Sequence, residues 1–120
     1  QVTTLLCTER SVELPPESID LAFVCDTYHH FEYPQSSLAS IHRALRPKGV
    51  LVLVEFAREP GKSSDWVLQH VRAGQEVFSR EIEQAGFKNT GEETFLKDNY
   101  LLRFDKLEAP KSAPAPPSSP

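Results

Sequence analysis

Two apolar runs, IDLAFVC at residues 19–25 and VLVLV at residues 50–54, decide the fold of this chain. Nearly continuous apolar runs of this length are typical of strands covered on both faces, as in a parallel sheet. Between them a helix is predicted to begin at Pro34, because proline is well tolerated in a first turn. Its buried face carries Leu38, Ile41, Ala44 and Leu45. A strand–helix–strand unit of this kind implies a right-handed crossover and a mostly parallel sheet in an α/β fold.

The flanking segments add further elements. Residues 2–7 are β-branched and apolar, which predicts a strand before the loop at residues 13–18. The helix that begins at Pro34 is expected to carry Arg46 in its last turn and to end at Pro47 and Gly49.

Two helices and a hairpin are predicted after residue 54. Ser64 is expected to cap a helix that runs through Val71, and Ser79 is expected to cap a helix at residues 80–85 that stops at Gly86. Two further segments, residues 90–96 and 99–104, are close enough to favour an antiparallel hairpin, with a core made of Phe95, Leu96, Tyr100 and Phe104.

The composition fits one small domain. The chain has 120 residues, a formal net charge of −4 and 39% hydrophobic residues. No apolar run reaches the roughly 18–20 residues that cross a bilayer, and the acidic balance disfavours a protein that binds nucleic acid through a basic surface. Two cysteines are too few for a disulfide scaffold, and no leader is visible, so we expect a cytoplasmic protein.

The chain divides into a folded part, residues 1–108, and a tail, residues 109–120. The tail is rich in Pro, Ala and Ser and has no large apolar side chain to bury, which predicts disorder. The chain contains no methionine, not even at position 1, so we expect it to be a fragment of a longer protein.

Four segments carry a resemblance to a known family. They are Leu14-Pro15 with Ser18-Ile19-Asp20-Leu21, then Tyr28-His29-His30-Phe31, then Leu45-Arg46-Pro47-Lys48-Gly49-Val50-Leu51-Val52-Leu53-Val54-Glu55, and finally Glu83-Gln84-Ala85-Gly86-Phe87. In this order and spacing, over about residues 2–105, they resemble class I S-adenosylmethionine-dependent methyltransferases of the type 11-like, small-molecule branch. The resemblance implies the C-terminal portion of a Rossmann-like methyltransferase sheet, with S-adenosyl-L-methionine as cofactor and a small-molecule methyl acceptor.

The chain also departs from this family. It contains no G-x-G, although glycines let a backbone approach the cofactor closely, and it lacks the first two strands of the family sheet. Half of the expected cofactor site is therefore missing. We expect the domain to be only the C-terminal half, the isolated piece to be inactive, and its central strands to be open on one side.

The resemblance also implies candidate site residues at the carboxyl ends of the strands, where open α/β sheets bind ligands. The candidates for the cofactor are Thr8, Glu9, Cys25, Asp26 and Thr27. An exposed loop at Thr8 and Glu9, and a purely structural carboxylate at Asp26, are the alternatives.

His29 and His30 are the candidate catalytic bases, because histidine is the side chain whose ordinary pKa lies nearest neutral pH. If one of them acts, we favour His30, and structural histidines are the alternative. Tyr28, Glu55 and His70 are candidates for binding the acceptor, with Glu55 at the rim of the pocket or in a solvated loop. Direct methyl transfer requires no metal.

Two other classes of protein compete with the methyltransferase. A truncated, non-catalytic module would complete its sheet with a partner, or associate with itself through an open edge. Another nucleotide-binding α/β enzyme, such as a dehydrogenase, is disfavoured because no catalytic Tyr-Lys pair is visible.

Overall fold

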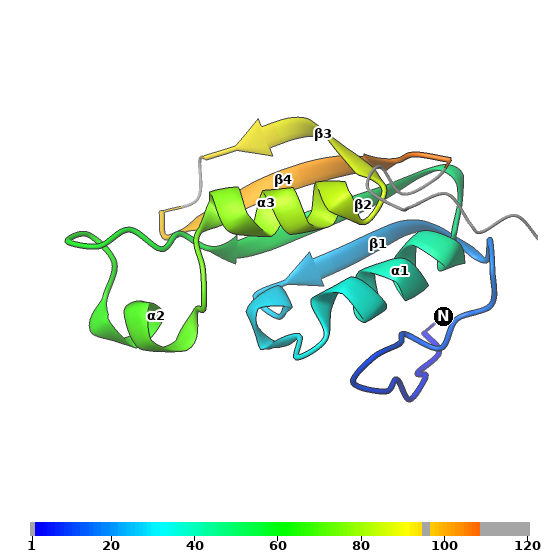
Figure 1. Cartoon of the computed structure of the whole chain (residues 1–120), viewed down its shortest axis with the longest axis horizontal. Helices are drawn as coiled ribbons and strands as arrows, with labels where there is room; N and C mark the ends of the chain where they lie inside the picture. Colours follow the sequence, from blue (N-terminus) through cyan, green and yellow to red (C-terminus); the bar gives the residue numbers. More distant parts are fainter. Residues whose placement is uncertain (1, 95–96, 109–120) are drawn as a thin grey trace, which may run out of the picture.

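The computed structural model describes residues 2–94 and 97–108, which form a layer of helices on a four-stranded sheet (Figure 1). The elements in chain order are β1 (Ile19–Cys25), η1 (Tyr28–His30), α1 (Pro34–Ala44), β2 (Leu45–Phe56), α2 (Asp65–His70), α3 (Gln75–Gln84), β3 (Phe87–Glu93) and β4 (Asn99–Lys106). The strand order is β1-β2-β4-β3. β1 and β2 are parallel, and β4 pairs antiparallel with both β2 and β3, which confirms the predicted α/β sheet with a terminal antiparallel hairpin.

The core lies between the sheet and two helices, α1 and α3, that cover the same face (Figure 1). Leu51 and Leu53 of β2 stand beside Phe104 and Leu102 of β4 in the register, and all four are fully or almost fully buried. From the helices, the core receives Leu38, Ile41, Phe78 and Ile82. The helical spacing predicted for α1 is therefore confirmed.

The opposite face of β1 is open, contrary to the expectation of a strand covered on both sides. Leu21 and Phe23 are 57% and 61% exposed, and they stand beside Val50 and Val52 in the register. Both helices that pack on the sheet lie on the other face, so no described element covers this apolar surface.

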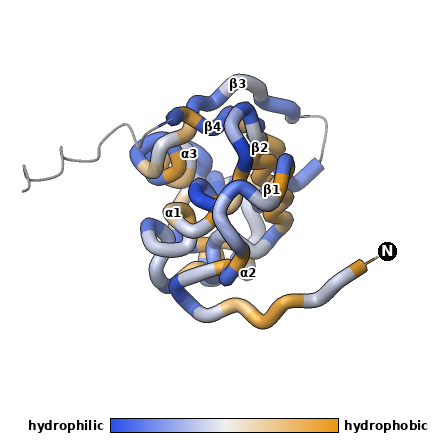
Figure 2. Tube along the Cα trace, turned by 90° about the vertical axis from the view of Figure 1, so that its right-hand side faces the viewer, coloured by the Kyte–Doolittle hydropathy of each residue, from blue (hydrophilic) through white to orange (hydrophobic). Residues whose placement is uncertain are grey.

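The strand predicted at residues 2–7 is wrong. This segment extends away from the body of the molecule (Figure 2), and Val2 and Leu6 are each 92% exposed. A strand exists only where a neighbour satisfies its backbone groups, and no described strand pairs with these residues. A β-branched and apolar composition was therefore not sufficient to form a strand at residues 2–7.

The predicted end of α1 is also wrong. The helix ends at Ala44, and β2 begins at once because Leu45 already pairs with Ile19. Arg46 lies in the strand and forms an ion pair with Asp20 at 2.9 Å. Gly49 is needed for close packing, since a Cβ there would lie 2.8 Å from the Arg46 carbonyl oxygen.

The helices after β2 follow the prediction in part. The Ser64 hydroxyl accepts a hydrogen bond from Val67 N–H at 3.3 Å and caps α2, which ends one residue before Val71. α3 begins after Gly74, so Ser79 lies inside this helix and does not cap it. The earlier start buries Phe78 completely.

The end of α3 and the hairpin follow the prediction more closely. Gly86 ends α3 with φ = +103°, as predicted. β3 begins at Phe87, three residues before the prediction, whereas β4 begins at Asn99 as predicted. Tyr100 and Phe104 are buried, which confirms half of the predicted hairpin core. Phe95, Leu96 and the tail at residues 109–120 lie outside the described residues.

No helix in the described part of the chain is long and apolar enough to span a membrane.

Candidate active site

The carboxyl ends of β1 and β2 and the start of β4 bring polar side chains together. Asp26, directly after β1, donates its backbone N–H to the Val54 carbonyl oxygen at 2.8 Å, and its Oδ1 accepts from Asn99 Nδ2 at 2.7 Å. Its backbone is left-handed, with φ = +52°, an arrangement that is strained for a residue other than glycine. The predicted candidates Cys25, Asp26 and Thr27 therefore lie at the sheet edge where α/β proteins bind ligands.

The electrostatics of this edge raise the pKa values of Asp26 and Cys25. Desolvation and the negative charge of Glu55 raise the pKa of Asp26, against the opposing effects of His29 and Asn99. Local desolvation and the carboxylates of Asp26 and Glu55 raise the pKa of the Cys25 thiol. Cys25 is exposed, and both cysteines are free. The Thr27 hydroxyl donates to the Cys25 carbonyl oxygen at 2.8 Å.

Glu55, at the end of β2, is fully buried and binds His29. Its Oε2 accepts the backbone N–H of His29 at 3.1 Å, and its Oε1 contacts His29 Nδ1 at 2.8 Å and accepts Phe56 N–H at 2.9 Å. An ionised carboxylate has no proton to donate, so the contact with an ionised Glu55 requires that Nδ1 carries the proton. Glu55 therefore does not form the rim of a pocket or part of a solvated loop, as the sequence suggested.

Two buried polar atoms beside Glu55 have no hydrogen-bond partner in the described part of the chain. They are His29 Nε2 and the Tyr100 hydroxyl, which belongs to the residue opposite Glu55 in the register. Burial and the charge of Glu55 raise the pKa of Tyr100 well above its usual range. His29 is thus held by the protein on one ring nitrogen and is unpaired on the other.

Tyr28 is a core residue and not an exposed acceptor contact. Its ring is 1% exposed, and its hydroxyl donates to Glu81 Oε1 at 2.8 Å. Arg72 binds the same carboxylate through two nitrogens, at 2.7 and 2.9 Å. Burial and the Glu81 carboxylate raise the pKa of Tyr28 far above its usual range. The sequence prediction for Tyr28 as a substrate contact is therefore not supported by its position.

His30 points elsewhere, although its ring centroid is only 4.1 Å from that of His29. It is exposed and lines a cavity of about 260 Å³ together with Thr8, Glu9 and Phe31. The structure therefore places Thr8 and Glu9, two candidates for binding the cofactor, around the same cavity as His30, the preferred catalytic candidate.

A second cavity, of about 540 Å³, lies beyond the end of β2. Phe56 and Trp66 line it, and Trp66 stacks on His70 with ring centroids 4.7 Å apart. His70 itself is not part of the lining. Its Nδ1 contacts the Trp66 carbonyl oxygen at 2.7 Å. His70, a candidate for binding the acceptor, thus stacks on the Trp66 ring and does not line the cavity itself.

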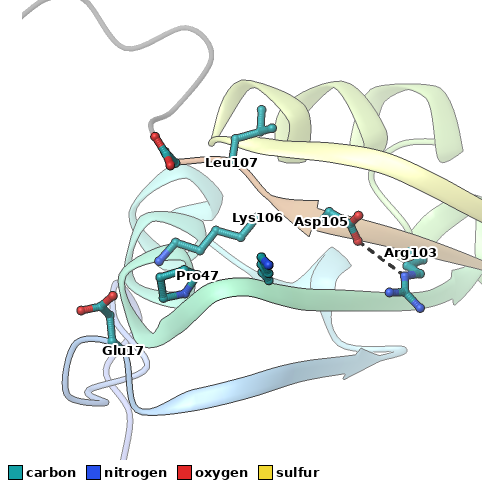
Figure 3. A pocket seen from close by; sticks show the side chains of 8 residues that line it. Glu17, Pro47, Arg103, Asp105, Lys106 and Leu107 are labelled. Atoms are coloured by element: carbon teal, nitrogen blue, oxygen red, sulfur yellow. Dashed lines mark ion pairs between the residues drawn. The ribbon is translucent and has the colours of Figure 1, made fainter.

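A third cavity, of about 710 Å³, lies at the opposite end of the strands, between Glu17, Pro47 and the end of β4 (Figure 3). Its volume exceeds those of the other two, but the amino ends of parallel strands are not where such sheets bind cofactors. Near this end of β4, His42 is buried and its Nε2 contacts the Leu107 carbonyl oxygen at 2.8 Å.

Comparisons with known proteins bear on this arrangement. A family model described as a methyltransferase domain, of type 11, matches residues 2–53. A solved S-adenosylmethionine-dependent methyltransferase from Aquifex aeolicus superposes with a TM-score of 0.76 at 19% identity, over 88% of this chain and 55% of that one. The four strands have the arrangement of part of the Rossmann-like sheet in this solved methyltransferase.

Two further solved structures have the same fold. A possible histamine N-methyltransferase from Thermotoga maritima has a TM-score of 0.72 at 20% identity, over 88% of this chain and 64% of that one. The 1,6-didemethyltoxoflavin-N1-methyltransferase of Burkholderia thailandensis, with bound 1,6-didemethyltoxoflavin and S-adenosylhomocysteine, has a TM-score of 0.66 at 15% identity, over 85% and 49%. The chain thus spans about half to two thirds of the length of these proteins. No curated protein gives a significant match.

Proposed function

We propose that these residues belong to an S-adenosylmethionine-dependent methyltransferase that acts on a small-molecule acceptor. The observation that carries the proposal is the polar edge at Asp26, Glu55 and His29, which lies at the carboxyl ends of the strands of a methyltransferase-like sheet. The domain match over residues 2–53 supports it.

The residues at this edge suit part of the cofactor. Glu9 and Glu32 line the smaller cavity beside Phe31, where a carboxylate can accept from an adenine amino group while the ring packs on the base. Asp26 supplies a carboxylate for the positively charged end of the cofactor. Cys25 and Thr27 would form the neighbouring wall. When bound, S-adenosyl-L-methionine supplies an electrophilic methyl group.

His30 is the residue that we assign to the acceptor's proton. It is exposed at the cavity, whereas His29 is buried and bound by Glu55. In this role His30 would take the proton from an acceptor oxygen or nitrogen while that atom gains the methyl group. The bond between the methyl carbon and the cofactor sulfur would break, which leaves S-adenosylhomocysteine. The protein otherwise contributes proximity and orientation. No step requires a metal.

We further propose that the 120 residues alone do not transfer methyl groups, since they contain no glycine-rich loop for the rest of the cofactor. A cytoplasmic location is proposed from the two free thiols. A non-catalytic module is the second candidate function. Two features favour it. The apolar face at Leu21 and Phe23 is exposed, and β1 is an edge strand, which can pair with a partner or with a second copy of the chain.

The test is a transfer assay on the native protein that contains this sequence. The protein is incubated with methyl-labelled S-adenosylmethionine and an extract of its own cells, and the products are separated by size. We expect a labelled small-molecule product that separates from unreacted S-adenosylmethionine by chromatography, and its loss in His30→Gln, while His42→Gln, which lies away from the edge, retains transfer. Label confined to protein or nucleic acid would refute the small-molecule acceptor, and no label would favour the non-catalytic module.

A further inference from the structure

The second cavity has the features of a site for a flat ring. Its volume of about 540 Å³ falls within the range of ordinary small-molecule sites. Phe56, Ala57, Trp66 and Val67 form its apolar wall. Trp66 is 50% exposed, which is unusual for a side chain with so much apolar surface.

Trp66 is held as a platform with one open face. The His70 ring lies nearly parallel to the indole, at an interplanar angle of 17°, and covers one side of it. Phe56 meets the indole edge-on at 74°, with ring centroids 5.4 Å apart. Trp66 lines the cavity, whereas His70 does not.

The charged and polar groups that line the cavity are largely balanced or already hydrogen-bonded, so they offer little binding energy to a charged ligand. Lys62 and Lys97 are balanced by Glu59 and Asp98, and Lys62 pairs with Glu59 at 3.5 Å. The Ser63 hydroxyl already donates to the Ala57 carbonyl oxygen and accepts from Glu59 N–H, both at 2.7 Å. Recognition at this cavity therefore rests on ring contact rather than on charge.

The cavity is also connected to the candidate active site. The Phe56 ring lies 5.9 Å from the ring of His29, and Asn99, which binds Asp26, follows the cavity residue Asp98 directly. A molecule in the cavity would lie at the edge of the sheet where the methyl group is proposed to be transferred.

We infer that this cavity binds an uncharged, flat aromatic or heteroaromatic compound that stacks on Trp66. As the identity of the acceptor, this inference rests on the proposed methyl transfer. As a binding site, it can be tested without the cofactor.

The test uses two probes of matched size, 2-naphthol and its saturated form, decahydro-2-naphthol. Trp66 is the one tryptophan of these 120 residues, and in the native protein its indole N–H resonance in a nitrogen–proton correlation spectrum is identified by its loss in Trp66→Phe. We expect 2-naphthol to shift this resonance saturably and the saturated alcohol to leave it in place at equal concentration. No shift with 2-naphthol, or equal shifts with both probes, would overturn the inference.

Calorimetry on variants gives a second readout. We expect Trp66→Leu to weaken 2-naphthol binding about tenfold, a loss typical of stacking on an aromatic side chain, and Trp66→Phe to retain most of it. Tyr33→Leu removes an exposed ring outside the cavity and should leave the affinity unchanged. Equal affinity in Trp66→Leu and the parent chain would contradict the inference, and the spectrum of the parent chain decides the matter if Trp66→Leu does not fold.

The two proposals fail separately. A native protein that binds 2-naphthol through Trp66 but transfers no methyl group refutes the enzyme and supports the ring site. A native protein that methylates a small molecule while 2-naphthol leaves the indole resonance in place refutes the ring site alone.

Discussion

The carboxylate of Glu55 binds both the backbone N–H and the imidazole Nδ1 of His29, at 3.1 and 2.8 Å, although the two residues are 26 positions apart. This contact joins the end of β2 to η1. It holds His29 in a buried position, whereas the neighbouring His30 is exposed. It also fixes the shape of the sheet edge at which Asp26 lies.

Replacing Glu55 tests this contact. In Glu55→Gln the amide NH₂ cannot accept from the groups that the carboxylate now satisfies, and the site is fully buried. We expect the free energy of unfolding to fall by about 2 kcal/mol or more, measured by urea denaturation. Glu59→Gln, an exposed partner of Lys62, should change it by less than about 0.5 kcal/mol. Equal effects of the two substitutions would contradict a structural role for Glu55.

Tyr28 offers a second test, of the cluster with Glu81 and Arg72. Tyr28→Phe keeps the buried ring and removes the hydroxyl that donates to Glu81. Since Arg72 still satisfies the carboxylate, we expect a loss of about 1 kcal/mol in the free energy of unfolding. The matched variant Tyr33→Phe alters a partly exposed ring and should be neutral. An unchanged free energy of unfolding in Tyr28→Phe would mean that the hydroxyl contributes nothing through Glu81 and is free for another partner.

His42 gives the chain a dependence on pH. Burial lowers its pKa, against the opposing contact with the Leu107 carbonyl oxygen, and the positive charge of Lys106 lowers it further. The unfolded chain, with an ordinary histidine pKa of about 6.5, therefore takes up the proton first. The contribution of His42 is fully present above this pH and declines as the pH falls toward the lower pKa of the folded state.

The measurement is urea denaturation at several pH values between 7 and about 5. The chain should lose stability as the pH falls, and His42→Gln should lose less over the same interval. Parallel curves for the two proteins would show that His42 does not titrate in this way.

Cys25 provides a chemical probe of the same edge. The carboxylates of Asp26 and Glu55 and local desolvation raise the pKa of its thiol, so the reactive thiolate is scarce. We expect iodoacetamide to modify Cys25 more slowly than Cys7 at pH 8, as followed by peptide mass spectrometry. Asp26→Asn should speed the reaction of Cys25. Faster labelling of Cys25 than of Cys7 would exclude the proposed electrostatics.

The local patterns predicted the fold well where the neighbouring element is close in the sequence. β1, α1, β2 and the hairpin were found because apolar spacing and proline or glycine signals determine them. The prediction of a strand at residues 2–7 failed because strand formation depends on a partner. The predicted start of α3 was wrong because burial of Phe78 outweighs the capping preference of Ser79.

The sequence placed several candidate residues at one edge of the sheet but did not reveal their contacts. Cys25, Asp26 and Thr27 follow from the end of an apolar strand, a purely local signal. The roles of Glu55, Tyr28 and Asn99 depend on partners 26, 53 and 73 positions away, and no local pattern encodes these contacts. For Asn99, the antiparallel register with Phe56 was the signal that would have placed it at the edge.

Calorimetric titration of the native protein with S-adenosylmethionine tests the central claim most directly. We expect binding that Asp26→Asn weakens and that Asp20→Asn, at the other end of β1, leaves unchanged, while the 120 residues alone do not bind. Absence of binding by the native protein, or equal binding by Asp26→Asn and the parent, would contradict a cofactor site at this edge of the sheet.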